Sequence, residues 1–269
     1  MINSIIPLPY EICGNKDSDK LLVFMHGFPD TTEIWDPIIA PLVNDAYILN
    51  VSYPNFSDKE TNPKGIDFEE LIDRLKETID QINDTGRKIL IVSHDWGALF
   101  SYWFDLKYQN YVSEIIGLDI GLIQDITCWK VYYQLVLAIA FVCGCCLGNF
   151  MTRRMVKGFN HQTSWESRIN SSWCYPYKNI WKKILSGARR KNKFPFIKAK
   201  LSCDIVYVWG TSKPVQFHNQ AWLNMVHKNP NNEVHAVKSN HWIMIDQPDF
   251  LIDLIKRRLL NLKLNIINV

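Results

Sequence analysis

The sequence predicts an α/β protein built on a mostly parallel central sheet with helices on both faces. Short, nearly continuous apolar runs alternate with stretches of helical periodicity, and such runs are typical of strands buried on both faces. The apolar runs predict strands at 21–26, 46–53, 88–93, 113–119, 203–209 and 233–237. The periodic stretches predict helices at 33–43, 66–82, 96–108 and 250–262.

The composition is that of an ordinary globular protein. Of the 269 residues, 47% are hydrophobic and 21% are charged, which excludes a chain that is disordered as a whole. The net charge of +3 is too small for a nucleic-acid-binding protein, so we expect no nucleic-acid partner. The seven cysteines lack paired metal spacing and predict reduced thiols in a cytoplasmic protein without a metal site. Residues 1–14 also lack the basic region of a secretory signal.

The alternation of strands and helices breaks once. Residues 122–200 show no strand pattern and are helical and rich in Trp and Tyr. The sheet pattern then resumes, which predicts one core domain at 1–121 and 201–269 with a helical cap at 122–200, inserted after the strand that ends at Asp119. Open α/β sheets bind ligands at the carboxyl ends of their strands, so the cap is expected to cover the site.

Two features of the predicted cap concern membranes. Residues 131–150 are twenty residues without a charge, flanked by Lys130 and by Arg153 and Arg154, which fits a membrane span in length. Because Tyr, Gln and Cys dilute the stretch and it lies in mid-chain, a lid helix is the favoured interpretation. Residues 167–203 contain ten Lys and Arg and no Asp or Glu. A solvated lid face is favoured here, and peripheral contact of the basic, apolar cap with a membrane is the alternative.

The strongest chemical signal lies where the third predicted strand meets a helix. The pentapeptide 93–97 reads Ser-His-Asp-Trp-Gly and follows a buried strand. Small residues at 93 and 97 allow the sharp strand-to-helix turn of a nucleophile elbow, and Asp95 stands where the serine of G-x-S-x-G would be. The alternative is that Asp95 is only the N-cap of the helix.

Two other segments favour the elbow. The strand at 21–26 runs into His-Gly-Phe-Pro at 26–29, a turn where the backbone N–H of Phe28 can face an oxyanion. The last predicted strand leads to His241, which can extend back over the sheet from its loop. Taken alone, His241 would be interpreted as an ordinary loop histidine without a catalytic role. Chance rarely supplies an oxyanion turn, a nucleophile, a cap and a late histidine in this order, so together they favour the elbow.

These segments resemble the α/β-hydrolase superfamily, and within it the epoxide hydrolase and haloalkane dehalogenase branch. The resemblance extends from about residue 10 to about residue 260 and is carried by 26–29 (His-Gly-Phe-Pro), 94–97 (His-Asp-Trp-Gly) and 240–242 (Asn-His-Trp). It implies that Asp95 attacks a saturated carbon to form an ester and that His241 activates water for its hydrolysis. The N–H groups of Phe28 and Trp96 would then hold the oxyanion.

The acid that orients the histidine departs from the common family pattern. That acid usually follows the strand ending at Trp209, but Lys213 stands near its expected place, and a lysine cannot accept the imidazole N–H. Some dehalogenases of this branch carry the acid at the end of the preceding core strand, where this chain has Asp119. We therefore expect Asp119 to orient His241, and the alternatives are a capping Asp119 or a pseudo-enzyme.

The leaving group distinguishes the two enzyme classes. Epoxide hydrolases of this branch polarise the ring oxygen with two cap tyrosines, and Tyr133 resembles the first of them in its Tyr-Gln-Leu segment. For the second we select Tyr175 over Tyr177, and the alternative for each is a packed aromatic residue of the lid. Haloalkane dehalogenases typically have Asn where Phe28 stands, which makes dehalogenation the second choice.

The sequence therefore predicts a hydrolase that acts at a saturated carbon through a covalent Asp95 ester, with a small apolar epoxide as substrate. A haloalkane dehalogenase-like hydrolase is the first alternative, and a non-enzymatic binding protein of the same fold is the second. No phosphate loop or dinucleotide-binding glycine motif is present, so no cofactor is expected.

Overall fold

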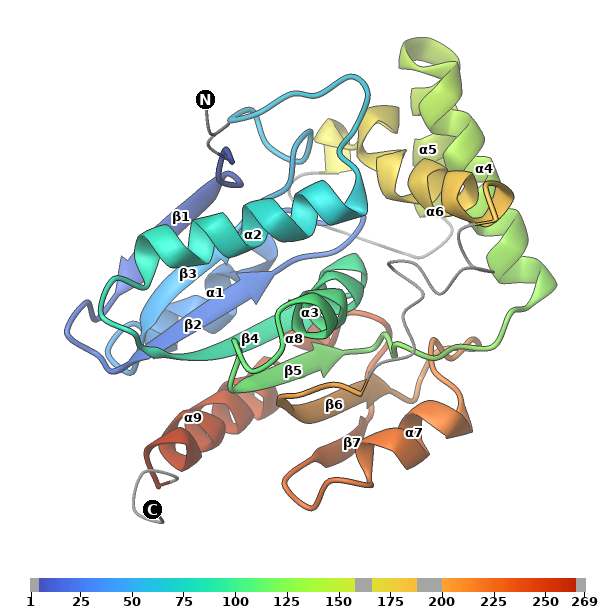
Figure 1. The fold of residues 1–269 in the computed structure, drawn as a ribbon. Helices are drawn as coiled ribbons and strands as arrows, with labels where there is room; N and C mark the ends of the chain where they lie inside the picture. The colour runs from blue at the N-terminus through green and yellow to red at the C-terminus, as the bar shows by residue number, and fades with distance from the viewer. Residues whose placement is uncertain (1–4, 158–165, 188–199, 265–269) are drawn as a thin grey trace.

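The computed structural model describes residues 5–157, 166–187 and 200–264 (Figure 1). These residues form a seven-stranded sheet in the order β1-β3-β2-β4-β5-β6-β7. All neighbouring pairs are parallel except β1 and β3, so the predicted mostly parallel sheet is confirmed. The strands are β1 (Tyr10–Gly14), β2 (Lys20–Met25), β3 (Tyr47–Val51), β4 (Lys88–His94), β5 (Glu114–Leu118), β6 (Asp204–Gly210) and β7 (Glu233–Val237).

Strand β1 was not predicted, and its burial explains why. It lies at the edge of the sheet and four of its five residues are exposed, so it lacks the continuous apolar run of a buried strand. By contrast, all six residues of β2 are buried. Periodicity therefore detects the inner strands of a parallel sheet better than an antiparallel edge strand.

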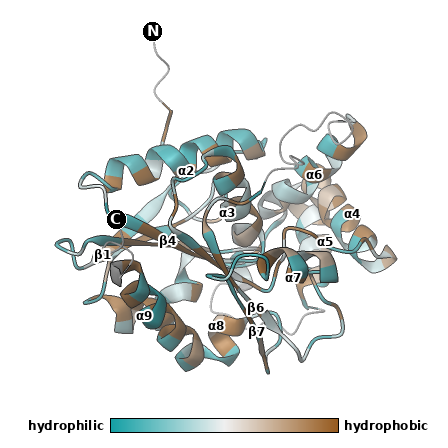
Figure 2. Cartoon of the chain, turned by 60° about the horizontal axis from the view of Figure 1, so that its bottom comes forward, coloured by the Kyte–Doolittle hydropathy of each residue, from teal (hydrophilic) through white to brown (hydrophobic). Residues whose placement is uncertain are grey.

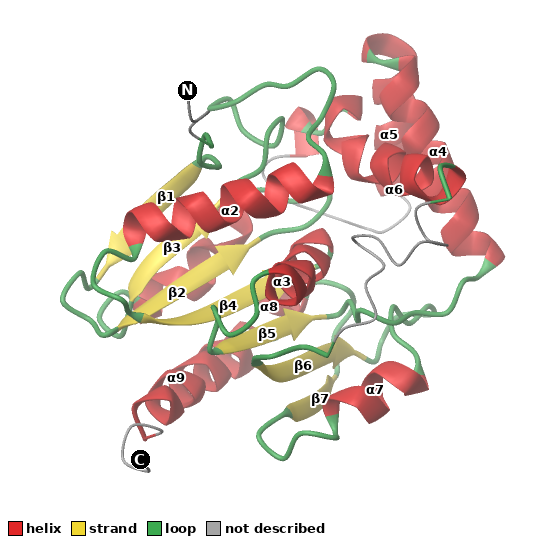
Figure 3. Cartoon of the chain, in the orientation of Figure 1, coloured by secondary structure: helices red, strands yellow, loops and turns green. Residues whose placement is uncertain are grey.

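Helices cover both faces of the sheet. One face carries α2 (Phe68–Ile82) and α3 (Trp96–Lys107), and the other carries α1 (Asp36–Ile39), α8 (Ile243–Asp246) and α9 (Pro248–Leu264) (Figures 1 and 3). A short helix, α7 (Gln220–Val226), precedes β7. Two layers of helices around a parallel sheet confirm the predicted α/β architecture.

The predicted helix at 33–43 is wrong as a single element. The segment forms three short pieces, η1 (Thr32–Trp35), α1 and η2 (Ala40–Leu42), of which the first and last are 3₁₀ turns. Pro37 and Pro41 each lack a backbone N–H, so a continuous helix would lose two of its hydrogen bonds.

The described residues between β5 and β6 pack as a helical layer beyond the carboxyl ends of the strands (Figure 1). They form α4 (Cys128–Cys143), α5 (Cys145–Lys157), η3 (Glu166–Arg168), η4 (Ser171–Cys174) and α6 (Tyr175–Leu185). Parts of the predicted cap, at 158–165 and 188–199, lie outside the described residues.

The uncharged stretch at 131–150 is divided between two helices. Gly144, with a φ of 65°, ends α4, and α5 begins at the next residue. Among the described residues, no helix combines the length and apolar character needed to cross a membrane. Of the ten basic residues in the segment 167–203, five fall at 188–199, outside the described part of the chain.

Candidate active site

A tight turn between β4 and α3 holds Asp95. Its φ of 52° and ψ of −119° lie in a region that side-chain-bearing residues rarely adopt. The turn depends on close backbone packing, because a Cβ on Gly97 would lie 2.4 Å from the carbonyl oxygen of Met25. A Cβ on Gly27 would lie 2.3 Å from the Cβ of Asp95. The elbow geometry predicted from 93–97 is therefore present.

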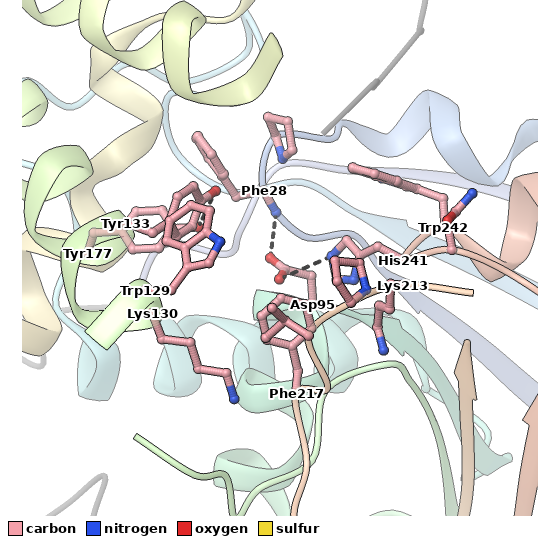
Figure 4. A pocket seen from close by; sticks show the side chains of 14 residues that line it. Phe28, Asp95, Trp129, Lys130, Tyr133, Tyr177, Lys213, Phe217, His241 and Trp242 are labelled. Atoms are coloured by element: carbon pink, nitrogen blue, oxygen red, sulfur yellow. Dashed lines mark hydrogen bonds and ion pairs between the residues drawn. The ribbon is translucent and has the colours of Figure 1, made fainter. Parts of the chain in front are cut away.

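The side chain of Asp95 points away from the helix that it precedes. No hydrogen bond joins its carboxylate to the first turn of α3, so the N-cap interpretation is wrong. Instead, Oδ1 accepts the backbone N–H of Phe28 at 2.9 Å, and Oδ2 lies 3.5 Å from Nε2 of His241 (Figure 4). The oxyanion turn, the elbow and the late histidine thus meet at one carboxylate.

Asp119 and His241 lie on two loops at the same edge of the sheet. Nδ1 of His241 is 2.6 Å from Oδ2 of Asp119, which is fully buried directly after β5. Asp119 also has a positive φ of 67°, which turns the chain at the strand end. Its Oδ1 accepts the N–H of Gly210 at 3.0 Å. The structure therefore brings Asp95, His241 and Asp119 into one chain of contacts.

Lys213, which stands near the usual place of the family acid, contacts Asp119. Nζ of Lys213 lies 2.9 Å from Oδ1 of Asp119 and also donates to the carbonyl of Gly210 and to Gln216. Burial lowers the pKa of Lys213, while the charge of Asp119 and the hydrogen bond to it act in the opposite direction. The Lys213 ammonium thus compensates the buried charge of Asp119.

A second polar network fixes the loop that carries the histidine. Nε2 of His94 lies 3.0 Å from the backbone oxygen of His241. On the far side of its ring, Nδ1 of His94 is 3.4 Å from Asp30, which also accepts the indole N–H of Trp242 at 3.2 Å. The sequence offered little sign of this network, because Asp30 and Trp242 are 212 positions apart.

The charges around His241 change its acidity. Burial alone lowers its pKa, but the hydrogen bond to Asp119 and the neighbouring carboxylate of Asp95 raise the pKa to about 9. The imidazole is therefore protonated at neutral pH. Neutralising Asp95, as ester formation would, removes part of this effect and lowers the pKa of His241, so that more of the imidazole is neutral and able to accept a proton.

Two tyrosines from the helical layer face this carboxylate across the pocket. The hydroxyl oxygens of Tyr133 on α4 and Tyr177 on α6 are 3.4 Å apart (Figure 4). The ring of Tyr177 packs edge-on against Phe28 and Trp96, with 5.2 Å between ring centroids in both pairs. Burial raises the pKa of both phenols well above its usual value, so both are hydrogen-bond donors at neutral pH.

The choice of Tyr175 as the second cap tyrosine is wrong in this geometry. Its side chain is fully buried outside the pocket, with its ring against Phe56 and its Cβ beside Gly65. Tyr177 lines the pocket instead. Successive helical residues turn by about 100°, so residues two apart on α6 point in nearly opposite directions.

Trp96 is a predicted site residue whose side chain does not line the pocket. It is nearly buried and stacks on Phe68 with 5.9 Å between ring centroids. As the first residue of α3, it has a backbone N–H without an intrahelical partner, next to Asp95. Its contribution to an oxyanion site would therefore come from the backbone alone.

The carboxylate opens into a cavity of about 290 Å³ between the sheet edge and the helical layer. Six of the fourteen residues that line it are aromatic, namely Phe28, Trp129, Tyr133, Tyr177, Phe217 and Trp242. Asp95 and His241 form the polar side, and two lysines, Lys130 and Lys213, lie near Phe217. This shape suits a small, largely apolar molecule with one reactive polar group.

Curated relatives match part of the chain. Epoxide hydrolase 3 of Mus musculus is 28% identical over 129 residues, which cover 46% of this chain and 34% of the mouse protein. The AB hydrolase superfamily protein YfhM of Bacillus subtilis is 32% identical over 122 residues, or 43% of this chain and 40% of that protein. The matched segments thus span less than half the length of these relatives.

Solved structures with the same fold include more than one kind of hydrolase. Epoxide hydrolase A from Mycobacterium thermoresistibile has a TM-score of 0.71 at 16% identity, covering 92% of this chain and 93% of its own. An esterase from a marine microorganism has a TM-score of 0.65 at 14% identity, with coverage of 93% and 98%. These similarities establish the α/β-hydrolase fold. Residues 22–254 match the Alpha/beta hydrolase family, and this match covers most of the sequence. The chain therefore belongs to the alpha/beta hydrolase family.

Proposed function

We propose that this protein is an epoxide hydrolase that acts through a covalent ester on Asp95. One observation carries the proposal: the Asp95 carboxylate, held on a strained turn, accepts the N–H of Phe28 and faces His241 instead of capping α3. The curated relatives support the same activity, since one of them is named an epoxide hydrolase.

The first step would open the epoxide ring. Oδ2 of Asp95 attacks a ring carbon as the carbon–oxygen bond of the ring breaks, and Tyr133 or Tyr177 gives its phenolic proton to the departing oxygen. The products are an alkyl ester on Asp95 and a hydroxyl group on the neighbouring carbon. The raised pKa values of both tyrosines keep their protons in place for this step.

The second step would hydrolyse the ester. His241 removes a proton from water, and the hydroxide attacks the ester carbonyl of Asp95. Oδ1, already bound to the N–H of Phe28, becomes the oxyanion, and a donor so placed contributes about 3 kcal/mol to stabilising the transition state. The ester oxygen leaves with the diol, and the proton on His241 returns through solvent to the tyrosinate. The sum is epoxide plus water giving diol.

Asp119 orients His241 in this scheme, and Lys213 compensates the charge of Asp119. The proposal also assigns the catalytic core to 1–121 and 201–269 and the tyrosine-bearing cap to 122–200. The aromatic wall of the cavity favours an apolar epoxide over a highly polar one.

A mixed panel of apolar epoxides and haloalkanes tests this function. We expect diol from epoxides and no halide from haloalkanes, and diol formation should be lost in Asp95→Asn. Halide without diol would instead assign a dehalogenase. Turnover of neither class by a folded protein would contradict the proposed function and favour a binding protein of this fold.

A further inference from the structure

The outer face of α4 is apolar and exposed. At helical spacing of three or four residues, it presents Tyr132, Leu135, Ile139 and Val142, each between 43% and 75% exposed. A soluble helix usually buries such a stripe and exposes a polar one. Figure 2 colours much of α4 and α5 brown, in keeping with this exposed apolar surface.

The turn between α4 and α5 continues this apolar surface at the end of the helical layer that lies farthest from the sheet. In Figure 1 the two helices rise at the upper right, away from the sheet. A Cβ on Gly144 would meet no atom within 4 Å, so the turn is surrounded by open space. Beyond it, Leu147 and Phe150 are 58% and 68% exposed. We refer to Val142, Leu147 and Phe150 with this turn as the hairpin tip.

Charge near the hairpin tip has one sign. Residues 128–157 contain no Asp or Glu. The basic residues Arg153, Arg154 and Lys157 are exposed on α5, behind the apolar tip. An apolar end followed by cations is the arrangement with which a protein inserts apolar groups between lipids while its basic groups bind lipid phosphates.

We propose that the hairpin tip docks on an anionic membrane surface. It inserts Val142, Leu147 and Phe150 into the interfacial layer, and Arg154 and Lys157 bind acidic headgroups. No helix among the described residues has the length and apolar character to span a bilayer. The contact is therefore peripheral.

The cavity lies at the opposite end of α4 from the hairpin tip, and the exposed apolar stripe of that helix runs between them. Trp129, Lys130 and Tyr133, from the first turns of α4, line the cavity, while the same helix carries the exposed apolar stripe. An apolar substrate dissolved in the bilayer would then reach the cavity along α4. This delivery role rests on the proposed function, whereas docking itself does not.

Vesicle flotation with the full chain tests the proposal without any substrate. Vesicles of phosphatidylcholine, with and without phosphatidylserine, are compared at low and high salt. We expect binding to the phosphatidylserine vesicles and a loss of about tenfold or more in the paired variant Val142→Asp, Leu147→Asp. The variant Arg154→Gln, Lys157→Gln should lose binding mainly at low salt, where charge attraction is strongest.

Leu260→Asp is the matched control. Leu260 is 61% exposed on α9, remote from α4 and α5, so its substitution places an exposed carboxylate on the protein without altering the hairpin tip (Figure 1). It should bind vesicles as the unsubstituted protein does, and thermal unfolding of each variant checks that the fold is intact.

Three results would overturn the proposal. The first is a protein that floats with neither kind of vesicle. The second is a folded Val142→Asp, Leu147→Asp variant that binds as well as the unsubstituted protein. The third is a dimer in sedimentation that the same variant converts to a monomer, in the absence of vesicle binding, which would assign this surface to a second copy of the chain. None of these results depends on whether the protein hydrolyses epoxides.

Discussion

Lys213 and Asp119 form a buried ion pair, with 2.9 Å between Nζ and Oδ1. Asp119 therefore contacts a cation through one oxygen and His241 through the other. The cation draws negative charge away from the imidazole and limits how strongly Asp119 holds the His241 proton. Lys213 thus sets the charge around the carboxylate that contacts His241.

Replacing Lys213 with Met should change both stability and pH dependence. The variant leaves Asp119 buried without its cation, which we expect to lower the free energy of unfolding by about 3 kcal/mol. The unbalanced carboxylate should also raise the pKa of His241, so the acidic limb of the pH–kcat profile moves to higher pH. Lys213→Arg, which keeps the charge, serves as control. An unchanged profile in a folded Lys213→Met variant would show that the ion pair does not act on His241.

Asp119→Asn tests the orienting acid. The amide keeps the size of the side chain but no longer stabilises a protonated imidazole, so kcat should fall by about 10⁴-fold with the fold preserved. Asp125→Asn is the control, because Asp125 lies on the exposed surface between β5 and α4. Steady-state diol formation measures both variants. Equal activity of Asp119→Asn and the unsubstituted protein would exclude Asp119 from this role.

The two pocket tyrosines should behave differently from their buried neighbour. Tyr133→Phe and Tyr177→Phe each remove a donor to the ring oxygen, and we expect kcat to fall by about 10²-fold in each. Tyr175→Phe should leave kcat nearly unchanged, because Tyr175 does not line the pocket. Rates of diol formation compare the three variants. A large loss in Tyr175→Phe alone would reverse the assignment of the second tyrosine.

The raised pKa of His241 predicts how stability depends on pH. Its pKa of about 9 in the folded protein exceeds the ordinary value of 6.5, so the folded state holds the proton more tightly. The resulting stabilisation, at most about 3 kcal/mol, is complete below pH 6.5 and is lost as the pH rises through 9. His241→Gln should lack this pH-dependent part of the free energy of unfolding. Denaturant titrations from pH 6 to 10 measure the free energy of unfolding of both proteins. If the two free energies changed with pH in parallel, the raised pKa of His241 would be contradicted.

The inner strands and the order of the site segments were predictable from sequence, because both depend on local patterns. Buried strands give continuous apolar runs, and the elbow at Asp95 needs small residues on either side. The second tyrosine was not predictable, because the choice between Tyr175 and Tyr177 depends on the rotation of α6 about its axis. From the sequence, Lys213 showed only that the usual acid is absent at that place. Its ion pair with Asp119 was not predictable, because the two residues are 94 positions apart in the chain.

Transfer of oxygen from water to Asp95 tests the covalent intermediate most directly. With enzyme in excess over an epoxide in water enriched in heavy oxygen, one turnover should place the heavy isotope in the Asp95 carboxylate. The diol should carry only unlabelled oxygen, from the ring and from the enzyme. Mass analysis of the peptide that contains Asp95 measures the first, and mass analysis of the diol measures the second. Heavy oxygen in the diol, with Asp95 unlabelled, would show that water attacks the substrate directly and would contradict the ester mechanism.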